Sequence, residues 1–190
     1  MPKSFVFLEF TDPDLNALVS GIRETATGNA PTTNVHITVR GPYSTPIRPE
    51  QLRRYHRTLA RDPILLDGYG LFRVDKRFIV YVKVQHPKLR QVWWKPDFPI
   101  SRYGFNPHVT LYEGPDSDRA HALLTFMQQE SVKYVTWDFC VTAYVSDHRD
   151  LFASPHPLQR HFLKLSRLGT VKPNFLATLD RALKQATRAA

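Results

Sequence analysis

Val35-His36-Ile37-Thr38-Val39 in the first half of the chain and Pro107-His108-Val109-Thr110-Leu111 in the second half share one pattern. In each, one apolar residue separates a histidine from a threonine, and a second apolar residue follows the threonine. Strand side chains alternate between two faces, so the pattern predicts two strands, each with its polar pair on one face and its apolar residues in a core. About 0.6 bare triplets are expected by chance, but two copies with both apolar positions filled occur in fewer than about one chain in a hundred.

The chemistry of these side chains suits cleavage of a phosphodiester without a metal. Such cleavage needs a base that activates water or a ribose hydroxyl and an acid that protonates the leaving oxygen. Histidine, with a pKa near 6.5, serves in both roles. Threonine hydroxyls donate to non-bridging phosphate oxygens. The sequence therefore predicts His36 and His108 as catalytic residues and Thr38 and Thr110 as phosphate-binding residues.

The rest of the sequence alternates expected strands and helices. Further strands are expected at 5–10, 64–70, 71–84 (divided by a turn at 74–77), 105–112, 134–145 and 162–168. Helices are expected from 12 or 14 to 25 and at 49–60, 116–130 and 175–189. Hairpins are too many for a doubly wound sheet, which favours an α+β fold of two lobes built on antiparallel sheets. We expect one domain over 1–190, with one His-Thr motif in each lobe and a C-terminal helix in 171–190.

Composition limits the partners. The net charge of +9 favours polyanions such as RNA ends, nucleotides or oligonucleotides. No apolar stretch approaches the roughly 18 residues of a membrane span, so we expect a cytoplasmic protein with no membrane partner, and no obligatory protein partner is evident. Cys140 is the single cysteine, which excludes an intramolecular disulfide and indicates a small buried hydrophobe.

No metal or other cofactor is expected. Acidic pairs near residues 12 and 116 precede expected helices, where helix capping accounts for them. Three histidines of the C-terminal third match no zinc-ligand spacing and indicate a solvated loop: His148, His156 and His161.

The paired motifs resemble the signature of the 2H phosphoesterase superfamily, two copies of H-x-[T/S]-apolar. His36-Ile37-Thr38-Val39 and His108-Val109-Thr110-Leu111 match it, and the chain looks most like RNA 2′,3′-cyclic phosphodiesterases, also called 2′-5′ RNA ligases. The resemblance implies two pseudo-symmetric lobes with antiparallel sheets facing a central cleft and helices outside. It also implies acid/base roles for the two histidines and phosphate binding by the two threonines.

Five further residues are candidates for lining the cleft. Because strand side chains alternate between faces, Arg40 is expected on the face of the first motif and Tyr112 on the face of the second. Arg40 would then contact phosphate, and Tyr112 would provide a stacking surface or a hydroxyl donor. A place at the exposed end of each strand explains both residues equally well. Tyr43 follows the first motif closely. Arg102 and Tyr103 belong to an aromatic and basic stretch that suits base stacking, although its tryptophans also suit a plug between the lobes.

Several functions are compatible with the sequence. The leading hypothesis is hydrolysis of a 2′,3′-cyclic phosphate or 2′-5′ phosphodiester of RNA or nucleotides. A second keeps the chemistry but takes cyclic oligonucleotide signals or small nucleotide cyclic phosphates as substrates. A third is an RNA-binding module without turnover. A structural use of the basic domain explains neither motif.

Overall fold

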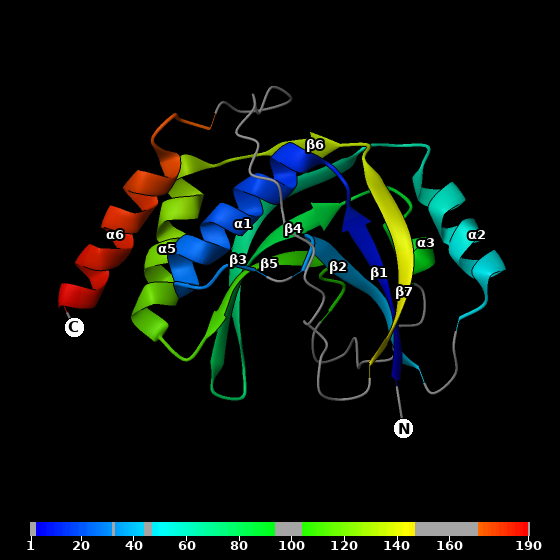
Figure 1. Cartoon of the computed structure of the whole chain (residues 1–190), viewed down its shortest axis with the longest axis horizontal. Helices are drawn as coiled ribbons and strands as arrows, with labels where there is room; N and C mark the ends of the chain where they lie inside the picture. Colours follow the sequence, from blue (N-terminus) through cyan, green and yellow to red (C-terminus); the bar gives the residue numbers. More distant parts are fainter. Residues whose placement is uncertain (1–2, 32, 44–46, 94–103, 147–170, 190) are drawn as a thin grey trace.

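The computed structural model describes residues 3–31, 33–43, 47–93, 104–146 and 171–189, which form an α+β fold with two antiparallel sheets (Figure 1). The first sheet has the order β2-β1-β7, with β1 at Lys3–Phe10, β2 at His36–Tyr43 and β7 at Phe139–Ser146. The second has the order β5-β4-β3-β6, with strands β3 Ile64–Val74, β4 Arg77–Gln85, β5 His108–Gly114 and β6 Tyr134–Thr136. The expected α+β class is confirmed.

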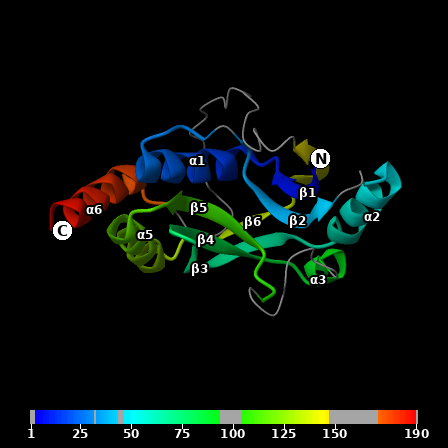
Figure 2. The ribbon, with the colours of Figure 1, turned by 90° about the horizontal axis from the view of Figure 1, so that it is seen from below.

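The helices pack on both sheets. The second sheet carries α1 (Pro13–Thr27) against β5 and α5 (Ser117–Glu130) against β3 and β4, with α6 (Phe175–Ala189) packed on both helices. On the first sheet, α2 (Pro49–Leu59) packs against β7 and contacts the short α3 (Leu89–Val92). Figure 2 shows α1 beside β5 and α2 near α3 at the opposite end. Buried residues from all these elements form one apolar cluster, so the two sheets share a core.

Most expected elements are confirmed within one to three residues. Two boundaries are wrong. The strand at 64–70 does not end at Gly70 but continues as β3 to Val74, where the expected hairpin turn follows. The strand expected at 134–145 is broken at Trp137 and Asp138, so its halves become β6 and β7 in different sheets. The strand expected at 162–168 lies outside the described residues. None of the helices in the described part is long and apolar enough to cross a bilayer.

A bulge in β3 shapes the second sheet. The pairing of β3 with β4 shifts between Leu66 and Tyr69, and Gly68 within the bulge has φ +82°. Positive φ favours glycine. Beyond the bulge Gly70 lies opposite Tyr81, whose ring crosses the glycine so closely that a Cβ there would overlap it. Small residues at this point let an aromatic side chain lie flat on the sheet.

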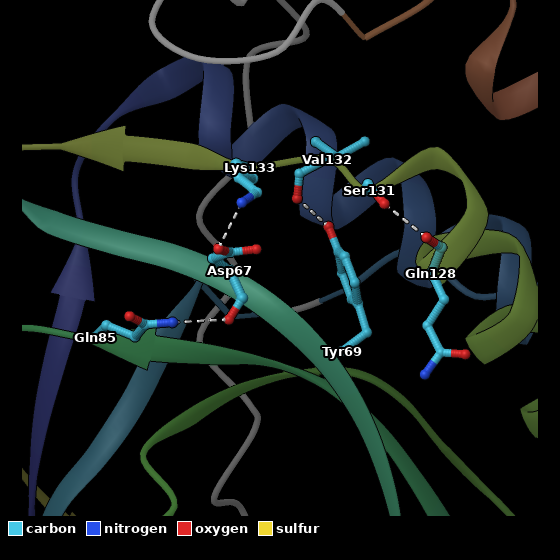
Figure 3. Close-up of polar contacts among 7 residues, drawn as sticks. All are labelled: Asp67, Tyr69, Gln85, Gln128, Ser131, Val132 and Lys133. Carbon is cyan, nitrogen blue, oxygen red and sulfur yellow. Dashed lines mark hydrogen bonds and ion pairs between the residues drawn. The ribbon is translucent and has the colours of Figure 1, made fainter.

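Polar contacts hold the bulge against the link between α5 and β6 (Figure 3). The Tyr69 hydroxyl donates to the main-chain oxygen of Val132. Asp67 forms an ion pair with Lys133 at 3.0 Å, and its main-chain oxygen accepts from Gln85 Nε2 at 3.3 Å. These contacts join β3, β4 and β6 at one end of the sheet.

The buried Asp12 connects the start of α1 to β6. Its Oδ1 accepts from the main-chain nitrogens of Asp14 and Leu15, both at 3.1 Å, which caps the helix as expected. The same carboxylate accepts from the Tyr134 hydroxyl at 2.7 Å and from Thr136 Oγ1 at 3.0 Å. Asp12 therefore serves as a cap and as a tertiary link.

We expect Asp12→Ala to destabilise the protein more than Asp116→Ala, the equivalent change at the cap of α5. Losing a cap costs about 1 kcal/mol. Asp12→Ala also removes the hydrogen bonds that the Tyr134 and Thr136 hydroxyls donate to the buried carboxylate, so its total cost is about 3 kcal/mol. Urea unfolding of both variants measures the difference. Equal losses would contradict the linking role of Asp12.

Candidate active site

The two motif strands lie at neighbouring sheet edges. β2 is the edge strand of the first sheet, β5 is that of the second, and the two strands are in contact (Figure 2). Their polar faces open into one cavity of about 580 Å³, which is lined by His36, Thr38, His108 and Thr110. The four residues predicted from the motifs are thus brought together, although they come from opposite halves of the chain.

Both imidazoles are held by the same hydrogen bond. His36 Nδ1 lies 2.8 Å from the main-chain oxygen of Asn34, and His108 Nδ1 lies 2.6 Å from that of Asn106. A carbonyl oxygen only accepts hydrogen bonds, so Nδ1 carries a hydrogen in both rings. In the neutral ring, Nε2 is then the nitrogen with the lone pair and exchanges the proton.

The strand ladder explains why these carbonyls are placed alike. The residue between each asparagine and histidine still accepts a bond from the neighbouring strand: Val35 O from Phe10 N, and Pro107 O from Val84 N, both at 2.9 Å. The carbonyl one residue earlier lies outside the ladder. It is therefore the one that turns to the imidazole two residues on.

Aromatic rings surround both histidines. His36 stacks on Phe7 at 4.5 Å between ring centroids, and His108 lies 4.9 Å from Tyr81 and 5.3 Å from Phe72. Burial lowers the pKa of both imidazoles from the ordinary histidine value, because the charged form loses hydration. The hydrogen bond to the carbonyl opposes this shift at each ring.

Two charged groups act on His36 alone. The Arg23 guanidinium on α1 lowers the pKa of His36, whereas the Glu9 carboxylate on β1 raises it. Glu9 pairs directly with His36 across the strands and is 7% exposed. Its Oε1 accepts from Thr142 Oγ1 at 2.9 Å. The two histidines therefore have matching hydrogen bonds but different electrostatic surroundings.

Side chains donate hydrogen bonds to main-chain oxygens at the unpaired edges of the two motif strands. The main-chain oxygen of Thr38 accepts from Trp93 Nε1 at 3.1 Å, and that of Thr110 accepts from Arg23 Nε at 2.9 Å. In the sequence, Trp93 follows α3 between β4 and β5 of the second sheet, and Arg23 lies on α1 between β1 and β2 of the first sheet. Each threonine carbonyl therefore accepts from a side chain that lies between two strands of the other sheet.

Arg40 does not share the face of His36 and Thr38, contrary to the alternation expected from the sequence. Thr38 pairs with Phe7. Arg40, two residues after Thr38, pairs with Val6, which is only one residue before Phe7 in β1, so β2 contains a bulge. The extra residue turns Arg40 toward α2, where Nη1 donates to the Tyr55 hydroxyl at 3.1 Å.

Tyr112 is turned away from the cavity in the same manner. Thr110 pairs with Tyr81, whereas Tyr112 pairs with Val80, the preceding residue of β4. Tyr112 is consequently 5% exposed and packs in the core. Neither Arg40 nor Tyr112 is among the described residues that line the cavity. Of Tyr43 only the main chain in β2 is described, and Arg102 and Tyr103 lie outside the described residues.

Sequence reasoning missed Phe72, Tyr81 and Lys83, which line the cavity together with Trp93. Lys83 lies directly opposite His108, and Tyr81 opposite Thr110. Period-two alternation along β4 separates these two side chains from the core valines, but only the strand register places them beside the motif. Trp93 both fills the junction, being 4% exposed, and lines the cavity.

No three His, Cys, Asp or Glu side chains gather as a metal site within the described ranges. Comparison of the chain with protein-family models, with curated proteins and with solved structures finds no match. The function is therefore inferred from the geometry of the site.

We expect both His36 and His108 to be Nδ1–H tautomers when neutral and to titrate below the unfolded-chain value. Nitrogen-15 NMR of the imidazole rings reports the tautomer and the pKa together, and the urea-unfolded protein supplies the reference. An Nε2–H tautomer at either ring, or a pKa above the reference, would contradict the described hydrogen bonds and burial.

Proposed function

We propose that this protein is a metal-independent phosphodiesterase of the 2H type, which hydrolyses a 2′,3′-cyclic phosphate or a 2′-5′ phosphodiester of RNA or nucleotides. One observation carries the proposal: two His-Thr pairs from separate sheets line one cavity, with both imidazoles held through Nδ1. We also propose that two pseudo-symmetric lobes face this cleft. Three features that occur at both motifs support this: the hydrogen bond from the imidazole to a main-chain oxygen, the side-chain bond to the threonine carbonyl, and the bulge after the threonine.

The reaction uses the residues of the cavity as a balanced acid/base pair. One neutral histidine removes a proton from water as its oxygen attacks phosphorus. The other, protonated, gives its proton to the leaving ribose oxygen as the P–O bond breaks. Thr38 and Thr110 donate to the non-bridging oxygens, whose negative charge grows in the transition state. After the reaction the first histidine is protonated and the second is neutral. The first then releases its proton to solvent and the second takes one up, which restores the starting state without a cofactor.

The remaining lining suits a nucleotide. A volume of about 580 Å³ lies in the range of small-molecule sites. Phe72, Tyr81 and Trp93 provide aromatic surface for a base, and Lys83 provides a positive charge for a second phosphate. These features favour recognition of a nucleotide unit at an RNA end or in a free nucleotide.

With EDTA present, we expect turnover of at least one member of a panel of 2′,3′-cyclic nucleotides, 2′-5′ and 3′-5′ dinucleotides and cyclic oligonucleotides. His36→Ala and His108→Ala each lower kcat/KM by about 10²- to 10⁴-fold, because each removes one proton-transfer partner. Thr38→Ala and Thr110→Ala each lower it on the order of 100-fold. Product chromatography identifies the bond cleaved.

His121→Ala is the matched control, since His121 is an exposed histidine on α5 and does not line the cavity. Its activity stays at the wild-type level. Tight nucleotide binding with no turnover would replace the proposal by an RNA-binding module. Activity abolished by EDTA would contradict a metal-independent mechanism.

The pH profile gives an independent prediction. Productive enzyme has one neutral and one protonated histidine, so kcat/KM is greatest between the two apparent pKa values of the pair. Burial lowers both pKa values, which places the maximum below about pH 6.5. Activity falls as pH rises, because the acid loses its proton. A maximum above pH 7.5 would contradict the lowered pKa values.

A further inference from the structure

We propose that Arg23 supplies the fixed positive charge of the phosphate site, acting through Thr110 to attract an anionic phosphoryl group between the two motifs. The inference rests on the proposed function and names a positioning residue outside the His-Thr pattern. Arg23 lies on α1, which packs against β5, the strand of His108 and Thr110. Arg23 is not itself among the residues that line the cavity, so it acts through Thr110. Its Nε donates to the main-chain oxygen of Thr110 at 2.9 Å.

The Arg23 guanidinium is partly removed from water without forming an ion pair. Arg23 is half-buried, and desolvation lowers the pKa of Arg23 to about 10, which leaves it charged at neutral pH. Within the part of the chain that the structure describes, no carboxylate forms an ion pair with it. A desolvated cation costs free energy unless an anion accompanies it. A bound phosphoryl group provides that anion.

The position of the charge fits this role. Nε is fixed on the carbonyl of a phosphate-binding threonine, while the charge also reaches His36 on the other motif and lowers its pKa. The guanidinium thus acts on both strands that receive the phosphate. Since burial favours neutral imidazoles, the histidines contribute little positive charge at neutral pH. Among the lining residues Lys83 is cationic, but it is exposed to solvent.

Several other charged or titratable groups surround His36. They reach its sheet face or the shared cavity from β1, α1, β7, β4 and β5: Glu9, Arg23, Cys140, Tyr144, Lys83 and His108. Glu9 opposes Arg23 at His36, but it is an anion and repels phosphate. Among the charged groups that act on His36, Arg23 is therefore the one that attracts a phosphate.

Titration of the wild-type protein with inorganic phosphate tests the proposal without turnover. In nitrogen-15 NMR, the Arg23 Nε–H resonance shifts together with those of the His36 and His108 rings and gives the same Kd. Because no substitution is involved, the result does not depend on whether a variant folds. Imidazole shifts with an unchanged Arg23 resonance would overturn the proposal.

Two substitutions separate charge from hydrogen bonding. Arg23→Gln retains an N–H donor but removes the charge; it raises the pKa of His36 and weakens phosphate binding at least about tenfold. Arg23→Lys retains the charge and stays closer to wild type in both measurements. His108, on which Arg23 has no resolved influence, is the internal reference.

Arg119→Gln is the matched control, because Arg119 Nη2 also donates to a main-chain oxygen, that of Thr25 at 3.4 Å, away from the cavity. If Arg23→Gln changes only thermal stability, as Arg119→Gln does, Arg23 is a brace and the proposal is wrong. Failure of the wild type to bind phosphate also overturns it, whereas turnover of the diester panel in that case would leave the proposed function standing. Phosphate binding through Arg23 without any turnover would support this role of Arg23 and contradict the proposed function.

Discussion

The structure depends on two edge strands that lie side by side with their polar faces on one cavity. An edge strand presents main-chain groups that a neighbouring strand does not satisfy. In β2 and β5 the carbonyls of the motif threonines are satisfied by Trp93 and Arg23 instead. This arrangement leaves the space between the sheets open for a ligand. It also lets a segment between two strands of each sheet hold the motif strand of the other sheet.

Duplicated hydrogen bonding does not make the two histidines equivalent. Each ring has an Nδ1–H bonded to the carbonyl two residues before it, so each has the same tautomer and orientation. Their cross-strand neighbours differ in sign, Glu9 beside His36 and Lys83 beside His108, and Arg23 acts on His36 alone. Acid/base catalysis needs one neutral and one protonated ring, and a difference in surroundings determines which ring holds the proton. The asymmetry comes from charges around a common scaffold.

The sequence predicts the motif residues and the fold class because both depend on local patterns. Alternation places His36 and Thr38 on one strand face, and the caps and apolar periodicity locate α1, α2, α5 and α6. Local patterns fail where a bulge inserts a residue, since nothing in the spacing after Thr38 announces that Arg40 turns to α2. They also fail for Lys83, whose place opposite His108 is set by strand register. The sequence does not distinguish Arg23 from other helical arginines, because its place beside Thr110 depends on the packing of α1 against β5.

We propose that the two motifs form a single phosphate site. A crystal structure of the protein with adenosine 2′-monophosphate tests it most directly. We expect one phosphorus between the sheets, with oxygens within hydrogen-bond reach of Nε2 of both His36 and His108 and of the hydroxyls of Thr38 and Thr110. A phosphate that contacts only one motif, or that occupies a surface outside the cavity, would contradict it.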